Sequence, residues 1–91
     1  MINVKLPTLL RGRAGDSSEV QGEGGSLGEL LDDLERRYPG LTGGLRDDGG
    51  LRRHVNVYVN GEDVRYTGGL ETALGTGDTV SILPAVAGGS R

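Results

Sequence analysis

The 91-residue sequence predicts a two-layer α+β domain, in which one amphipathic helix covers one face of a β-sheet. Residues 26–38 carry apolar side chains at helical spacing, and several short segments alternate apolar and polar residues as half-buried strands do. The predicted order is strand, strand, helix, strand, strand, strand. Because no repeat or linker divides the chain, we expect one domain over residues 1–84 and a flexible C-terminal tail with a Gly-Gly pair over residues 85–91.

The first two predicted strands precede the helix. INVKL, at residues 2–6, alternates apolar and polar residues, and Pro7 closes this strand. Residues 8–18 are rich in glycine and serine, so we expect a connector of turns. A weaker alternation around Val20 predicts the second strand.

The predicted helix has clear start and stop signals. Ser26 and Glu29 form an S-x-x-E capping box, which satisfies backbone N–H groups at the start of a helix. Pro39 and Gly40 end the helix. Its apolar stripe, which we expect to pack on the sheet, consists of Leu27, Leu30, Leu31, Leu34 and Tyr38.

Three more strands are predicted after the helix. VNVYV, at residues 55–59, is followed by Asn60-Gly61, a favoured type I′ turn pair, and by a short return strand over residues 62–65. The last strand is TVSIL, at residues 79–83. Single helical turns are predicted in the loops at residues 41–45 and 70–74.

The composition excludes several classes of function. Without cysteine, disulfides, thiolate nucleophiles and thiolate-bound metals are excluded. The one histidine, His54, lacks carboxylates at ligand spacing, so neither a metal nor another cofactor is expected. The net charge of −3 gives no broad attraction to nucleic acid or anionic lipid, and no apolar run reaches the roughly 20 residues of a membrane span. We therefore expect a cytoplasmic protein.

No catalytic constellation is predicted. Asp32-Asp33 lies on the predicted helix, where adjacent side chains point about 100° apart and cannot converge as an acid–base pair. We expect both this pair and Asp47-Asp48, in a glycine-rich loop, to be solvated surface residues. GEGGSLGE, before the helix, lacks the G-K-[ST] ending of a phosphate-binding loop. The chain is therefore not expected to be an enzyme.

Four segments carry a resemblance that spans nearly the whole chain: INVKLP, SLGELLDDLERRYPG, VNVYVNGEDVR and GDTVSILPAVAGG. They resemble the MoaD/ThiS family of ubiquitin-like sulfur carriers and, within it, the carriers of cysteine biosynthesis. Adjacent glycines alone mean little, since the chain has five such pairs, but this pair follows the final strand. The resemblance implies the β-grasp fold, a mixed sheet of four to five strands with one main helix packed on one face. The most specific segment, D-x-V-x-x-x-P-x-V-x-G-G, comprises Asp78, Val80, Pro84, Val86, Gly88 and Gly89.

The resemblance also implies where the chemistry occurs. In such carriers an E1-like adenylating enzyme uses ATP to adenylate the C-terminal glycine carboxylate, and sulfur then displaces AMP to leave a thiocarboxylate. Glycine has no Cβ, so a Gly-Gly end can enter a narrow channel. This chain departs from the family pattern, because it continues for two residues beyond the glycine pair. The implied site residues are Gly89 as the thiocarboxylate position, Gly88, Ala87 and Val86 as tail access, and Ser90 and Arg91 as residues to be removed.

The partners that the resemblance implies are proteins. They are an E1-like adenylating enzyme, a sulfurtransferase and a sulfur-acceptor enzyme such as a cysteine synthase. A JAMM-type metalloprotease is the candidate for removing Ser90 and Arg91. By strand alternation Leu83 and Tyr58 should face away from the helix, and with Pro84 they are the expected docking residues.

Other interpretations remain open at this point. The chain could be the small subunit of molybdopterin synthase, a ubiquitin-like modifier joined to lysines through Gly89, or a β-grasp interaction module with an inert tail. Ser90 and Arg91 could also be additions to the natural chain.

Overall fold

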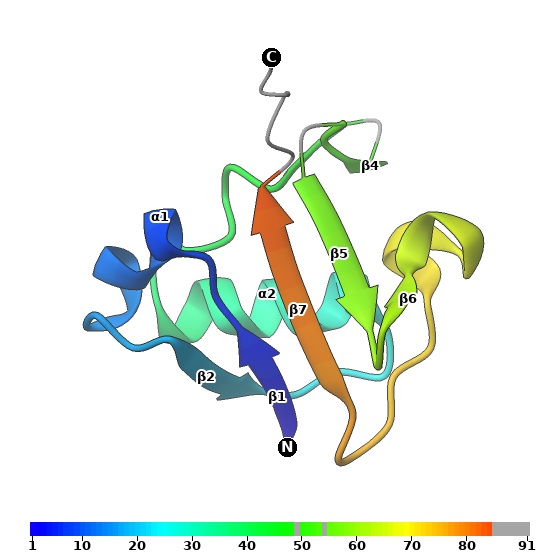
Figure 1. The fold of residues 1–91 in the computed structure, drawn as a ribbon, viewed down its shortest axis with the longest axis horizontal. Helices are drawn as coiled ribbons and strands as arrows, with labels where there is room; N and C mark the ends of the chain where they lie inside the picture. Colours follow the sequence, from blue (N-terminus) through cyan, green and yellow to red (C-terminus); the bar gives the residue numbers. More distant parts are fainter. Residues whose placement is uncertain (49, 54, 85–91) are drawn as a thin grey trace.

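The computed structural model describes residues 1–48, 50–53 and 55–84, which form two layers (Figure 1). A five-stranded sheet, with strand order β2-β1-β7-β5-β6, makes one layer, and helix α2 (Leu27–Arg37) packs across one face of it. β1 and β7 run parallel and the other neighbours run antiparallel, so the sheet is mixed. The predicted α+β arrangement is confirmed. The strands are β1 (Ile2–Lys5), β2 (Glu19–Gly22), β5 (Val55–Val59), β6 (Glu62–Asp63) and β7 (Thr79–Pro84).

Leucines of α2 fill the space between the helix and the sheet. Four of the five residues in the predicted stripe are fully buried, and Tyr38 packs at the edge of the same cluster. Burying each leucine contributes about 2 kcal/mol, so this stripe holds the two layers together. The fully buried residues of the interface are Leu27, Leu30, Leu31 and Leu34 on α2, and Val4, Val57, Val80 and Ile82 on the sheet.

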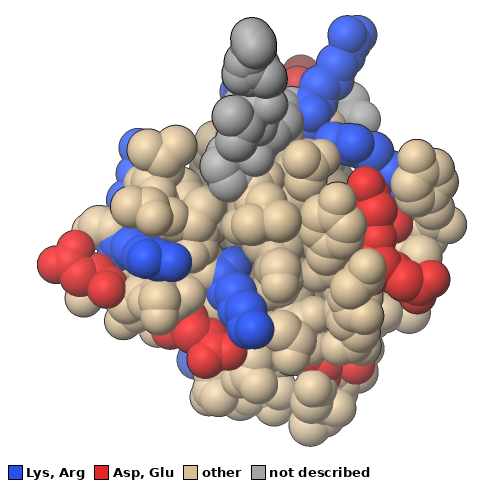
Figure 2. Space-filling view, viewed as in Figure 1, with Lys and Arg blue, Asp and Glu red and all other residues tan. Residues whose placement is uncertain are grey.

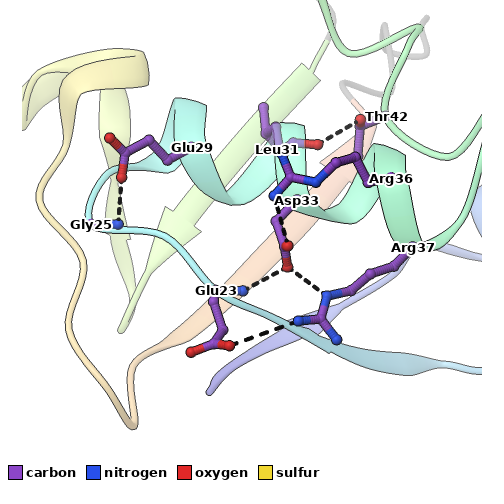
Figure 3. A network of polar contacts seen from close by, with 8 residues as sticks. All are labelled: Glu23, Gly25, Glu29, Leu31, Asp33, Arg36, Arg37 and Thr42. Carbon is purple, nitrogen blue, oxygen red and sulfur yellow. Dashed lines mark hydrogen bonds and ion pairs between the residues drawn. The ribbon is translucent and has the colours of Figure 1, made fainter.

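The predicted capping box is present with a shift of one residue. The Ser26 hydroxyl accepts a hydrogen bond from the Glu29 N–H (3.3 Å). The Glu29 carboxylate accepts one from the Gly25 N–H (2.8 Å), one residue earlier than the motif predicts (Figure 3). Side chains therefore satisfy backbone groups on both sides of the helix start, which fixes where α2 begins.

Asp33 is not the solvated residue that the sequence predicts. It is only 8% exposed. Its carboxylate accepts hydrogen bonds from the Glu23 N–H (2.9 Å), from Arg36 (3.0 Å) and from Arg37 (2.6 Å) (Figure 3). Glu23 directly follows β2, so Asp33 joins the helix to the end of an edge strand. The helical spacing could not show this contact, because the partner N–H comes from a separate element.

Replacing Asp33 by alanine is expected to lower the free energy of unfolding by about 2 kcal/mol, because charge-assisted hydrogen bonds are lost and the Glu23 N–H loses its partner. Urea unfolding followed by circular dichroism measures this change. Asp32→Ala is the matched control. Asp32 is exposed, as predicted, and pairs with Arg46 at the surface, so its loss should change stability by less than about 0.5 kcal/mol. Equal losses in the two variants would contradict the role assigned to Asp33.

The same carboxylate makes stability depend on pH. The hydrogen bond from the Glu23 N–H, assisted by the two arginines, holds the pKa of Asp33 below its usual value of 3.8. The contribution of Asp33 is therefore complete above its unfolded-state pKa and is lost as the pH falls through the lower folded-state pKa. The stability difference between the wild type and Asp33→Ala should shrink below about pH 4. Glu35 and Asp78 also have lowered pKa values, but both are present in the two proteins and cancel in the difference.

β5 and β6 form the predicted hairpin. Asn60 (φ 51°) and Gly61 (φ 90°) both have positive φ, as a type I′ turn requires. The return strand is shorter than predicted, because the Asp63 carboxylate accepts a hydrogen bond from the Arg65 N–H (2.9 Å). That bond begins a 3₁₀ helix, Val64–Tyr66, which takes the chain away from the sheet.

The connector between β1 and β2 is more regular than predicted. Where the sequence predicts turns, the chain forms a short helix, α1 (Thr8–Arg11), and then a 3₁₀ helix, Gly12–Ala14. Pro7 precedes α1, and this fits the preference for proline at helix starts. α1 lies beside the end of the sheet at which β7 finishes (Figure 1).

The connector between α2 and β5 has no helix at residues 41–45, all of which the structure describes. A single turn there is closed by the hydrogen bond from the Leu45 N–H to the Thr42 carbonyl (3.1 Å), and it does not continue as a helix. The Thr42 N–H donates to the Glu35 carboxylate (2.9 Å) and not to a helical carbonyl. Gly43 and Gly44, which are poor helix formers, follow directly. The chain then forms a small antiparallel pair, β3 (Arg46–Asp47) with β4 (Gly50–Leu51). In the next loop, the turn predicted at residues 70–74 is a 3₁₀ helix over Gly69–Glu71.

Candidate functional site

The candidate site begins where β7 ends. β7 is the central strand, between β1 and β5, and its last residue is Pro84, which pairs with Val55 (Figure 1). The sequence predicts that the last strand ends at residue 83, whereas β7 includes one more residue, Pro84. The Val55 N–H donates to the Arg52 carbonyl and the Val55 carbonyl accepts from Arg65, so no N–H is needed from Pro84 at this pair.

The residues that follow Pro84 carry most of the predicted site, and they lie outside the described residues. These are the tail-access residues Val86, Ala87 and Gly88, the thiocarboxylate position Gly89, and Ser90 and Arg91. His54, at which the sequence predicts no metal site, also lies outside them. The described structure therefore shows Pro84, the last described residue before the tail, which we call the tail root, and the surface near it.

Leu83 lies on the sheet face opposite α2, which we call the open face. Its neighbours Ile82 and Val80 are buried in the core, whereas Leu83 is 47% exposed. Tyr58 lies on the same face and is half-buried. Leu83 is opposite Asn56 and Tyr58 is opposite Ser81, so Leu83 and Tyr58 are diagonal neighbours with Cβ atoms about 7–8 Å apart.

A hollow beside Leu83, which we call the α1–β7 groove, adds a residue that the sequence did not single out. Leu9, on α1, is 79% exposed and lines this groove together with Leu83. A single exposed leucine is ordinary, but two that share one hollow form an apolar contact surface. In the sequence, the only sign of this surface is the apolar pair Leu9-Leu10 after Pro7. The fold is needed to show that this pair lines a groove together with β7. The groove has a volume of ≈ 170 Å³ and is lined by Pro7, Leu9, Leu10, Gly44, Leu45, Val55, Ile82 and Leu83.

A second hollow shares Leu9 and Leu83 with the α1–β7 groove and reaches Lys5, the last residue of β1. Lys5 and Arg11 also line it, whereas neither hollow has a carboxylate among its described lining residues. Figure 2, drawn from the same side as Figure 1, shows a mostly uncharged face with both Lys or Arg and Asp or Glu side chains around it. The surface around the tail root is therefore apolar with cationic neighbours, although the whole chain is acidic.

Arg65 fixes the strand beside the tail root. Its guanidinium donates to the carbonyls of Arg53 (3.2 Å) and Val55 (3.3 Å) and to the side chain of Asn56 (2.5 Å). Asn56 is the residue opposite Leu83. Arg65 therefore fixes the start of β5, which pairs with the end of β7. Because its guanidinium makes these structural hydrogen bonds, we do not assign Arg65 a role in binding a ligand.

Within the described residues, no group of three or more His, Cys, Asp or Glu side chains could hold a metal ion. No helix in the same part of the chain is long and apolar enough to cross a membrane.

A five-stranded mixed sheet with one helix across it, whose central strand β7 ends beside an apolar groove, is typical of ubiquitin-like proteins with the β-grasp fold. Comparison of the sequence with known families shows which ubiquitin-like family this chain belongs to. The chain belongs to the ThiS family, whose model matches residues 4–89. It is a homologue of the sulfur carrier protein CysO of Mycobacterium tuberculosis, with 50% identity over 97% of this chain and 98% of that protein. The predicted MoaD/ThiS resemblance and β-grasp fold are thus confirmed, and the chain is a sulfur carrier homologue, not an enzyme.

Two further relatives bear on function. A crystal structure of the Amycolatopsis orientalis BexX/CysO complex matches with a TM-score of 0.92 and 45% identity, covering 97% of this chain and 99% of that one. Small archaeal modifier protein 3 of Haloferax volcanii is 48% identical over 64 residues, which is 70% of this chain and 70% of that protein. The relatives of this chain thus include proteins named as carriers and proteins named as modifiers.

Proposed function

We propose that this protein carries sulfur as a thiocarboxylate on Gly89 after Ser90 and Arg91 have been removed. The single observation that supports this most is the extent of the family match, which runs from residue 4 through the whole described fold to Gly89 and leaves out the last two residues. The described structure agrees with the proposal, because β7 ends five residues before Gly89 at the rim of an apolar surface.

The chemistry follows from the weakness of a carboxylate as an electrophile. Adenylation by ATP converts the Gly89 carboxylate into an acyl-adenylate with release of pyrophosphate, and AMP is then a good leaving group. A sulfur nucleophile then attacks the acyl carbon, the bond to AMP breaks, and a thiocarboxylate remains. This chain contributes an unhindered glycine end that a partner's channel can hold in position, while the catalytic groups belong to the partner.

The proposed partners are an E1-like adenylating enzyme, a sulfurtransferase and a sulfur-acceptor enzyme such as a cysteine synthase, in the cytoplasm. A JAMM-type metalloprotease is proposed to remove Ser90 and Arg91. Leu83, Tyr58 and Pro84, together with Leu9, form the proposed docking surface. Leu83 directly precedes Pro84, lines the α1–β7 groove with Leu9 and is a diagonal neighbour of Tyr58. The CysO of Amycolatopsis orientalis is known in a complex with BexX, and this supports the proposal that this chain also binds a protein partner.

The mass of the protein purified from its native host tests the proposal. A chain that ends at Gly89 with one oxygen replaced by sulfur is the expected species, and it should revert to the carboxylate on hydrolysis. An unprocessed chain without sulfur, under conditions of active sulfur assimilation, would contradict the proposal.

A second candidate function is protein modification through an isopeptide bond from Gly89. The similarity to small archaeal modifier protein 3 favours it. The same purification separates the two functions, because a modifier appears as covalent conjugates of higher mass whose target lysines carry residues 66–89 after tryptic digestion.

A further inference from the structure

β6 covers only part of the outer edge of β5. Within the described residues, β6 pairs with Tyr58 and Val59 of β5 and with no residue before them. Outward-facing backbone groups near Val55 therefore need other partners, because an edge strand carries a row of N–H and C=O groups without a neighbouring strand. Arg65 supplies a donor at this place.

The start of β5 also holds the end of β7. The Asn60 N–H donates to the Thr79 carbonyl (2.8 Å), and hydrogen-bonded pairs recur at every second residue of an antiparallel ladder. The pair of Asn56 and Leu83, four residues further along the ladder, is therefore a hydrogen-bonded pair. It is the last such pair in the described ladder, because the pair beyond it, at Pro84, is of the other kind. The position of Leu83 thus depends on the position of Asn56.

The Arg65 guanidinium bonds to the start of β5 from the outer edge. It donates to the carbonyls of Arg53 (3.2 Å) and Val55 (3.3 Å) and to the side chain of Asn56 (2.5 Å). Its planar shape places the donors in a fixed arrangement, which the ammonium group of a lysine cannot reproduce. Asn56 is therefore held between Arg65 on one side and Leu83 of β7 on the other.

The backbone that carries Arg65 is itself fixed. Arg65 lies in the 3₁₀ helix Val64–Tyr66, and the side chain of Val64 is fully buried in the core. The Asp63 carboxylate accepts a hydrogen bond from the Arg65 N–H (2.9 Å) and forms a longer ion pair with the guanidinium (3.9 Å). The core therefore sets the position of Arg65, and Arg65 sets the position of the start of β5.

We propose that Arg65 is a positioning residue for partner binding: through Asn56 it fixes Leu83, the apolar anchor of the docking surface. The proposal rests on the proposed function, in which an adenylating enzyme docks on this surface. Arg65 lines neither hollow, so its effect on the partner passes through the Asn56–Leu83 pair. Without Arg65 the partner has to order the end of this ladder on binding, which weakens the complex and leaves the chemical step unchanged.

Arg65→Lys tests the proposal, because it keeps the charge and removes the fixed arrangement of donors. With the form that ends at Gly89, the adenylating enzyme and ATP, the KM for the carrier is expected to rise about tenfold, while kcat changes by less than about twofold. The rate of pyrophosphate release is measured at a temperature at which circular dichroism shows every variant to be folded. A residue that only stabilises the fold would leave both constants at their wild-type values under this condition.

Arg37→Lys is the matched control. Arg37 also fixes an edge strand through its guanidinium, since it donates to Asp33 (2.6 Å) and pairs with Glu23 (3.8 Å), directly after β2. It lines neither hollow, so Arg37→Lys should keep the wild-type KM and kcat even where it lowers stability. The methyl NMR signals of Leu83 give a second readout that needs no enzyme. They should shift in Arg65→Lys and stay in place in Arg37→Lys.

Asn56→Ala tests the path from Arg65 to Leu83. This variant removes one acceptor of Arg65 and keeps the strand backbone. The KM should rise by less than in Arg65→Lys, and adding Asn56→Ala to Arg65→Lys should change it little further, because both substitutions remove the same hydrogen bond. Effects that multiply independently would show that Arg65 does not act through Asn56. If Arg65→Lys does not fold, Asn56→Ala decides, since a raised KM at unchanged kcat supports the proposal and wild-type constants overturn it.

The remaining outcomes separate this proposal from the proposed function. An unchanged KM in Arg65→Lys, an equal rise in Arg37→Lys, or a loss of kcat at unchanged KM would each overturn the role of Arg65 and leave the carrier function intact. If the wild type releases no pyrophosphate, the carrier function fails, and the methyl signals of Leu83 decide on Arg65 alone. A shift confined to Arg65→Lys then supports the positioning of Leu83 by Arg65, and unshifted signals overturn it.

Discussion

The form of the chain that ends at Gly89 is expected to be thiocarboxylated readily, whereas the form that ends at Arg91 should lose at least about two orders of magnitude in rate. In the longer form the acyl group of Gly89 is a peptide amide with Ser90, so there is no carboxylate at that position to adenylate. The Arg91 side chain is also bulky and always charged, which obstructs a channel that fits glycine.

Intact mass after incubation with the adenylating enzyme, ATP and a sulfur source measures this difference. A third form that ends at Ser90 separates the two causes. It lacks the arginine, and its carboxylate is one residue out of place. If the position of the carboxylate is what limits the rate of thiocarboxylation, the form that ends at Ser90 should be as inactive as the full chain. If the full-length chain is thiocarboxylated as fast as the Gly89 form without cleavage, sulfur is not carried on Gly89.

The parts of the fold that depend on local signals could be predicted from the sequence. The leucine stripe of α2, the capping residues Ser26 and Glu29, and the Asn60-Gly61 turn each depend on neighbours within a few residues, and the structure has all of them. The alternation in the strands also predicts which side chains are buried, because one face of the sheet packs on the helix.

The features that were wrong or missed depend on contacts between distant segments. Asp33 is buried because its carboxylate accepts a hydrogen bond from the N–H of Glu23, ten residues earlier and directly after β2. Leu9 becomes part of the site because α1 places it beside Leu83. Neither contact has a local pattern, so a tertiary structure was needed to find them.

The position of the reactive end was predicted by resemblance and not by physical pattern. Gly88 and Gly89 form one of five adjacent glycine pairs, and no local property distinguishes this pair from the other four. The family match through residue 89 supports the choice, and the described fold adds the surface on which a partner would bind.

Placing a carboxylate in the α1–β7 groove is expected to weaken adenylation at least about tenfold, which corresponds to about 1.4 kcal/mol. Leu83→Asp and Leu9→Asp each put a charge into an apolar hollow that a partner must desolvate on binding. Because Leu83 is 47% exposed and Leu9 is 79% exposed, the fold should tolerate both changes. The rate of pyrophosphate release at limiting carrier concentration measures the effect.

Tyr66→Asp is the matched control for this prediction. Tyr66 is also a large exposed residue, 87% exposed, but it lies on the 3₁₀ helix after β6 and lines neither hollow. It should therefore keep the wild-type rate. The two leucines contact the same hollow, so the double variant Leu9→Asp with Leu83→Asp should lose less than the product of the single effects. Unchanged kinetics in Leu83→Asp, or an equal loss in Tyr66→Asp, would show that the partner docks elsewhere on the domain.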